Sequence, residues 1–171
     1  MKAQKGFPGQ SLNLTLNLKL IADYGLIGLP NAGKSSLLNE LTNSNAKIGN
    51  YAFTTLSPNL GVINGKVVAD IPGLIEGASE GKGLGINFLK HIEKVKVLLH
   101  CIDATSDNYT RDYKIVRDEL KKYNPEMLKK KEVILLTKSD LVTDIKKFKN
   151  AIPVSIHDLD SINKILFRLR R

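Results

Sequence analysis

The chain has 171 residues, of which 42% are hydrophobic and 25% are charged, so it can form one globular domain with one substantial core. Its net charge of +9 suits a polyanion such as RNA, but lysine-rich solvated helix faces explain it equally well, and no nucleic-acid-binding motif is present. No apolar run or N-terminal pattern indicates a membrane span or a secretory leader, and the single cysteine excludes an internal disulfide, so we expect a cytoplasmic protein.

The predicted elements begin with residues 11–20, in which leucine alternates with polar residues, as in a strand with one buried face. Beyond this segment, strands alternate with helices. We predict strands at 22–27, 59–63, 67–71, 95–102, 133–136 and 152–154, and helices at 34–41, 86–94, 109–123, 144–150 and 159–170. This alternation predicts a three-layer α/β/α fold with a mostly parallel sheet. Asn64-Gly65 predicts a tight hairpin between the second and third of these strands.

The turn after the strand at 22–27 carries a phosphate-binding motif. Its residues fit the pattern G-x-x-x-x-G-K-[ST] and are Gly28-Leu29-Pro30-Asn31-Ala32-Gly33-Lys34-Ser35. Gly28 and Gly33 let the backbone curl so that successive N–H groups point at phosphate oxygens, and the following helix adds the partial positive charge of its N-terminus. Lys34 would supply a point charge between the β- and γ-phosphates, and the Ser35 hydroxyl would ligate Mg²⁺.

A second motif follows the strand at 67–71 and reads Asp70-Ile71-Pro72-Gly73. Because Asp70 would stand beside the phosphate loop, its carboxylate can hold the magnesium ion through a water molecule. Gly73 offers a backbone N–H to the γ-phosphate with no side chain in the way. The same D-x-x-G pattern also describes a common turn, so its meaning depends on the phosphate loop that precedes it.

The polar loop between these two motifs would lie against the same phosphates. We assign five of its residues to the site, namely Phe53, Thr54, Thr55, Leu56 and Ser57. A threonine here can give its hydroxyl to Mg²⁺ and its N–H to the γ-phosphate, which would order the loop only with a triphosphate bound. We prefer Thr55 to Thr54 for this role, and the alternative is a plain loop that enters a strand.

The base pocket is predicted from a buried strand that ends in Thr137-Lys138-Ser139-Asp140. Guanine presents N1–H and an N2 amino group as adjacent donors that the Asp140 carboxylate can accept together, whereas adenine lacks this pair. The alkyl stem of Lys138 can lie along one purine face. The commoner form of the motif has asparagine where Thr137 stands, so we expect weaker affinity but the same base preference.

A turn after the last predicted strand would close the base pocket. It contains Ser155, Ile156 and His157. Ser155 matches the serine that is usual in this turn, whereas Ile156 replaces the usual alanine, so the backbone contact to the guanine oxygen is the weakest part of this interpretation. His157 would border the pocket rather than take part in chemistry.

Together these residues resemble the Obg family of GTPases. The likeness covers roughly residues 18–171 and is most specific in the first half, where the matching stretches are residues 20–35, 51–61, 70–78, 83–85, 88–93 and 98–103. It implies a Ras-like P-loop NTPase with six strands, one of them antiparallel, that binds GTP, GDP and Mg²⁺ and assists assembly of the large ribosomal subunit through its RNA or proteins. Obg proteins carry a large glycine-rich domain before the GTPase domain. The resemblance therefore implies that residues 1–20 are the last strand and linker of such a domain, and that residues 21–171 form the GTPase domain.

The predicted mechanism is a slow hydrolysis of GTP. The residue after D-x-x-G is commonly a glutamine that orients the attacking water, but here it is Leu74. Lys34, Thr55 and Gly73 are the predicted catalytic residues. Asn31 has two interpretations: in several related GTPases an asparagine here helps to bind K⁺ in place of an arginine finger, and otherwise it is only a turn residue.

Other functions stay open at this point. A phosphate-loop ATPase or kinase is disfavoured by Asp140. A binding-only sensor of GTP, GDP or guanosine tetraphosphate agrees with Leu74 and with the expectation, drawn from the resemblance, that most of the glycine-rich domain is missing. An RNA-binding protein with an incidental nucleotide site has only the positive charge in its favour.

Overall fold

The computed structural model describes residues 9, 11–12, 22–42, 59–71, 95–145 and 147–169. In chain order, its elements are β1 (Tyr24–Ile27), α1 (Lys34–Leu41), β2 (Asn59–Ile63), β3 (Lys66–Asp70), β4 (Val97–Asp103), α3 (Tyr109–Tyr123), the 3₁₀ helix η2 (Pro125–Lys129), β5 (Lys131–Thr137), the 3₁₀ helix η3 (Ser139–Leu141), β6 (Ile152–Pro153) and α4 (Leu159–Leu169). Each strand agrees with its predicted range to within two residues at either end.

The strands form one six-stranded sheet in the order β2-β3-β1-β4-β5-β6. Among the described strands only β2 and β3 pair antiparallel, whereas β1 is parallel to β3 and β4, and β5 is parallel to β4 and β6. The predicted mostly parallel sheet with one antiparallel strand is thus confirmed. Because parallel strands carry their carboxyl ends at one edge, the segments that follow β1, β3, β4 and β5 meet there.

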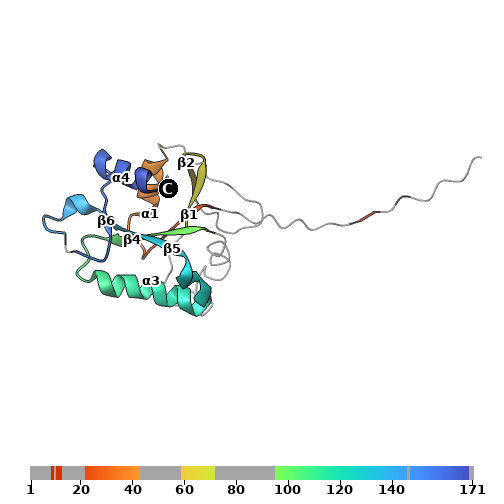
Figure 1. Ribbon diagram of the computed structural model, residues 1–171, viewed down its shortest axis with the longest axis horizontal. Helices are drawn as coiled ribbons and strands as arrows, with labels where there is room; N and C mark the ends of the chain where they lie inside the picture. Colours follow the sequence, from red (N-terminus) through yellow and green to blue (C-terminus); the bar gives the residue numbers. More distant parts are fainter. Residues whose placement is uncertain are drawn as a thin grey trace, which may run out of the picture.

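Helices cover both faces of this sheet (Figure 1). α1 and α4 pack on one face, where Leu37 and Ile165 share a core cluster with Leu99 of β4. α3 packs on the other face, where its Val116 contacts a second cluster that contains Leu98. The alternation of neighbouring β4 leucines between the two clusters confirms the three-layer arrangement. No helix in the described part of the chain combines the length and the hydropathy that a bilayer crossing requires.

The turn between β2 and β3 consists of Asn64 and Gly65, as predicted. Their φ angles are 49° and 75°, both in the left-handed region that a tight two-residue hairpin requires. The hairpin register pairs Asn59 with Asp70, and the β1–β3 register pairs Asp70 with Leu26. The hairpin thus sets Asp70 beside the end of β1.

The helix predicted at 144–150 is wrong for the residues of that segment that the structure describes. Lys149 has a φ of 47°, which a helix interior excludes, and the Ala151 N–H donates to the Phe148 carbonyl oxygen in a turn, at 3.0 Å. Phe148 packs edge-on against Tyr109 and Tyr113 of α3. Tertiary packing of an aromatic side chain therefore overrides the helical pattern of this lysine-rich segment.

Two predicted elements fall outside the described residues. They are the helix at 86–94 and most of the strand at 11–20, of which only Ser11 and Leu12 are described. The predicted domain boundary after residue 20 lies in the same part of the chain and stays a prediction. The 3₁₀ helices η2 and η3 were not predicted from the sequence.

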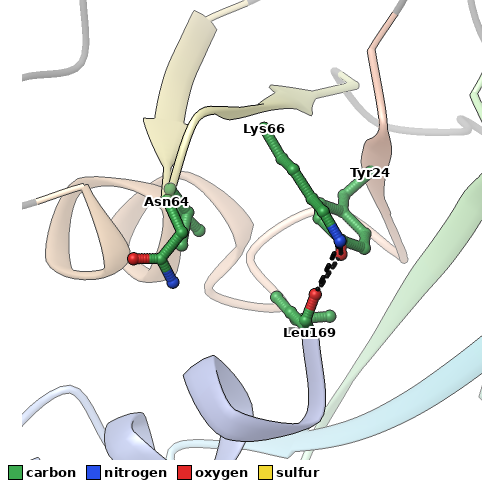
Figure 2. A pocket seen from close by; sticks show the side chains of 5 residues that line it. Tyr24, Asn64, Lys66 and Leu169 are labelled. Atoms are coloured by element: carbon green, nitrogen blue, oxygen red, sulfur yellow. Dashed lines mark hydrogen bonds between the residues drawn. The ribbon is translucent and has the colours of Figure 1, made fainter. Parts of the chain in front are cut away.

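The C-terminal end of α4 is fastened to the sheet at the edge opposite the phosphate loop. Figure 2 shows Tyr24 of β1 and Lys66 of β3 pointing at the carbonyl of Leu169. The Tyr24 hydroxyl donates to that oxygen, and the Lys66 ammonium lies 3.1 Å from it and 3.0 Å from the Tyr24 hydroxyl. The helix dipole favours a cation at a helix C-terminus, so the Lys66 ammonium stabilises the last turn of α4 against the sheet.

Candidate nucleotide-binding site

The loop between β1 and α1 curls tightly because three of its residues adopt left-handed conformations. The φ angles are 149° at Gly28, 62° at Asn31 and 72° at Gly33. At Gly28 the backbone also approaches β4 so closely that a Cβ there would lie 2.3 Å from the carbonyl oxygen of Cys101. Only glycine satisfies both conditions, which explains the first glycine of the motif.

Lys34, the first residue of α1, directs its ammonium into this curl. Its Nζ donates to the carbonyl oxygens of Gly28 at 3.1 Å and of Leu29 at 2.8 Å. Burial lowers the pKa of Lys34, while the negative charge of Asp70 opposes that shift. A buried cation bonded to neutral oxygens gains further from an anion, so the curl is suited to phosphate.

Ser35 and Asp70 form the neighbouring oxygen pair. The Ser35 hydroxyl donates to Oδ2 of Asp70, and the buried Oδ1 of Asp70 has no hydrogen-bond partner among the described residues. Hydroxyl and carboxylate oxygens are ligands that Mg²⁺ prefers, and one oxygen of this carboxylate is unpaired among the described residues, so these two residues fit that ion. In the part of the chain that the structure describes, no group of three or more His, Cys, Asp or Glu side chains is arranged to hold a metal ion, so Ser35 and Asp70 would supply only part of the coordination.

Thr137 joins the predicted base motif to the phosphate loop. Its buried hydroxyl lies 2.9 Å from the carbonyl oxygen of Ala32 and 3.1 Å from that of Ile102. One hydroxyl hydrogen can serve either acceptor, so the ends of β4 and β5 and the loop are held together at this point. The residue that replaces the usual asparagine therefore contacts the loop directly.

Asp140 and Ser155 come together at the same edge of the sheet. Asp140 is exposed, and a hydrogen bond with Ser155 holds its pKa below the ordinary value, so its carboxylate is ionised at neutral pH. The Ser155 hydroxyl accepts from the His157 N–H at 3.0 Å, and the Ser155 N–H donates to Ser161 at 3.1 Å. No hydrogen bond among the described residues uses the N–H of Ile156, which is partly exposed.

Lys138 lies between these groups and has a partner that the sequence did not reveal. It adopts a left-handed φ of 56°, and its Nζ lies 2.6 Å from Oδ2 of Asp103 at the end of β4. Asp103 directly follows the predicted strand at 95–102 and ends one of the stretches that match the Obg family, but neither feature identified Lys138 as its partner. Ser139 follows Lys138 and begins η3.

Several predicted site residues lie outside the part of the chain that the structure describes. They are Phe53, Thr54, Thr55, Leu56, Ser57, Pro72 and Gly73. Their assignments remain predictions. The described site residues, by contrast, converge on the edge of the sheet at which β1, β3 and β5 end.

The curled loop and the α/β/α layers define a P-loop protein of the nucleotide-binding α/β class. The family model described as 50S ribosome-binding GTPase matches residues 23–138, more than half of the chain. The chain therefore belongs to the 50S ribosome-binding GTPase family.

Within that family the chain is similar to GTPase Obg. It is 55% identical to GTPase Obg of Pelagibacter ubique over 147 residues, which cover 84% of this chain and 45% of that protein. It is 53% identical to GTPase Obg of Bacteroides fragilis, over 82% of this chain and 38% of that protein. The resemblance drawn from the motifs is confirmed, and the chain spans less than half the length of these relatives.

Solved structures confirm the Ras-like fold. Aquifex aeolicus Era bound to GDP and AlF4⁻ is 21% identical with a TM-score of 0.59, over 86% of this chain and 56% of that chain. A GDP-bound mutant of the S. thermophilus FeoB G-domain is 19% identical with a TM-score of 0.66, over 86% of this chain and 60% of that chain. At these identities the likeness concerns the fold alone.

Replacing Thr137 with valine tests the link between the base motif and the loop. Valine keeps the shape but cannot donate to the Ala32 carbonyl, so we expect the free energy of unfolding to fall by about 1–2 kcal/mol. Urea denaturation measures this change, and Thr110→Val at an exposed position of α3 is the matched control. A loss at Thr137 no larger than that at Thr110 would show that the link contributes nothing.

Proposed function

We propose that the chain binds GTP with Mg²⁺ and hydrolyses it slowly, as a nucleotide switch that acts in assembly of the large ribosomal subunit. The observation that carries this proposal is that two features meet at one edge of the sheet. The first is a buried lysine inside a curled loop, and the second is the exposed Asp140 carboxylate, which follows β5. Thr137, the last residue of β5, joins this strand to the loop. The lysine in the curled loop suits phosphates, and the Asp140 carboxylate suits a purine with two adjacent hydrogen-bond donors.

The phosphates would lie in the curl. Backbone N–H groups of the loop from Asn31 to Ser35, which lie beyond Pro30 and its missing N–H, would donate to their oxygens together with the N-terminus of α1. Lys34 would exchange its carbonyl partners for the same phosphate oxygens. Ser35 would hold the Mg²⁺ directly and Asp70 through a water molecule, and the hydroxyl of Thr55 is the further predicted ligand. When bound, the ion offsets negative charge on the β- and γ-phosphate oxygens.

The base would lie against Lys138 and Asp140. The Asp140 carboxylate would accept from guanine N1–H and the N2 amino group, and the ionised state of this carboxylate supports that role. The lysine stem would cover one purine face. The turn at Ser155 would close the pocket, where the N–H of Ile156 can donate to the guanine oxygen because the neighbouring N–H groups of Ser155 and His157 already have acceptors.

Hydrolysis would be slow because Leu74 cannot hydrogen-bond to the attacking water. Gly73 and Thr55 would bind the γ-phosphate through their backbone N–H groups. The alternative is a binding-only sensor of GTP, GDP or guanosine tetraphosphate. Release of phosphate from stoichiometric GTP in a single turnover would separate the two, because a sensor releases none.

The ribosomal role is supported by the family to which the chain belongs and by its similarity to GTPase Obg. The net charge of +9 is compatible with a surface of ribosomal RNA. The chain spans less than half the length of these relatives, and within the proposed role the described fold would supply the nucleotide-dependent part.

Base selection is tested by Asp140→Asn. The amide presents a donor where guanine also presents one, whereas xanthine offers an acceptor, so the variant should lose about 100-fold or more in GTP affinity and gain affinity for XTP. Dissociation constants for GTP, XTP and ATP measure this, with the exposed Asp144→Asn as the matched control. Wild-type protein that binds ATP as tightly as GTP would instead indicate an ATPase or kinase.

We further propose that Asn31 helps to bind K⁺ at the phosphates. Its side chain is exposed on the loop, although its left-handed φ of 62° also agrees with a plain turn residue. Turnover should then be at least about tenfold faster in KCl than in NaCl, since an arginine finger contributes a factor of 10³–10⁵. Asn31→Gly keeps the backbone conformation and should abolish the difference, and equal wild-type rates in the two salts would refute the proposal.

A further inference from the structure

The ion pair between Lys138 and Asp103 lies within the proposed base site. The Lys138 ammonium lies 2.6 Å from the Asp103 carboxylate, and the two side chains are 35% and 23% exposed. Lysine has a long stem with many rotamers, so a wall made from this stem is well defined only if its far end is held. Asp103 is the group that holds it.

Asp103 is itself fixed from the opposite side. Its Oδ1 accepts from the Thr105 N–H at 2.9 Å and from the Thr105 hydroxyl at 2.7 Å, which leaves Oδ2 for the lysine. The backbone is equally constrained, because Asp103 pairs with Thr137 across β4 and β5 and the Ala104 N–H donates to the Thr137 carbonyl oxygen at 2.8 Å. Burial alone would raise the pKa of Asp103, but the hydrogen bonds from Lys138 and Thr105 bring it below its ordinary value, so the carboxylate stays ionised.

We propose that Asp103 is a positioning residue for guanine recognition, which holds the Lys138 ammonium so that the lysine stem forms a fixed wall against one face of the purine. The proposal rests on the proposed guanine-nucleotide function. It extends that function to a residue of β4, outside both the phosphate-loop motif and the base motif. A paired ammonium also places less uncompensated positive charge beside the base.

Replacing Asp103 should weaken binding of the base but not binding of the phosphates. In Asp103→Ala the lysine stem gains freedom, so GDP should bind about tenfold more weakly, while inorganic pyrophosphate, which has no base, should bind as it does to the wild type. A general disturbance of the site would weaken both ligands. Isothermal titration of the full chain with GDP and with pyrophosphate, each with Mg²⁺, measures the two effects.

Asp107→Ala is the matched control, because Asp107 is an exposed carboxylate in the same β4–α3 connection. It should leave the affinity for both ligands unchanged. Asp103→Asn keeps the shape and the acceptor oxygen but loses the charge, so its GDP affinity should fall between those of the wild type and Asp103→Ala. Unchanged GDP affinity in Asp103→Ala, or an equal loss for GDP and pyrophosphate, would overturn the proposal.

A double-mutant cycle with Lys138→Met separates this inference from the function on which it rests. Methionine keeps an apolar stem without the ammonium, so adding Asp103→Ala should cost much less GDP affinity than it costs the wild type. Equal losses of GDP affinity in the wild-type and Lys138→Met backgrounds would show that Asp103 does not act through the lysine. If the wild type fails to bind GDP while it still binds pyrophosphate, the proposed guanine-nucleotide function itself fails.

Discussion

The close contact between the phosphate loop and β4 is the constraint on which the rest of the site depends. β4 lies between β1 and β5 in the middle of the sheet, and Cys101 is buried there with 1% of its surface exposed. The carbonyl oxygen of Cys101 leaves no space for a side chain at Gly28. This oxygen cannot move away without disrupting the sheet, because β4 is paired on both sides. The chain must therefore turn sharply as it leaves β1, and the curl that results ends at Lys34 on the N-terminus of α1.

This geometry has an electrostatic consequence. The curl brings the Lys34 ammonium into a buried position where its described partners are two carbonyl oxygens, while Asp70 stands close enough to oppose the loss of its charge. A desolvated cation with neutral partners interacts more strongly with a multiply charged anion than an exposed lysine does. At the same edge, Asp140 presents a negative charge to solvent. A ligand that satisfies both groups must combine phosphates with a hydrogen-bond donor edge, as a guanine nucleotide does.

The parts of this arrangement that depend on neighbours in sequence could be predicted from the sequence. The phosphate loop, the Asn64-Gly65 hairpin and the ends of α1 and α3 follow from local spacing and from backbone preferences. Contacts that depend on the order of strands could not be predicted. The bond from Thr137 to Ala32 joins residues far apart in the chain, and the bond from Lys138 to Asp103 exists because β4 and β5 are adjacent. The error at 144–150 has a similar origin, since Phe148 packs on α3 and the local pattern contains no sign of that contact.

The affinity of Lys34→Ala for GTP tests the central claim most directly. The lysine is the one side-chain cation in the described part of the curl, so its removal should weaken GTP binding about 100-fold or more, at about 1.4 kcal/mol per factor of ten. Lys114→Ala on the exposed face of α3 should bind GTP as the wild type does. Thermal unfolding of both variants shows whether the fold is kept. A folded Lys34→Ala protein that binds GTP as tightly as the wild type would contradict the account.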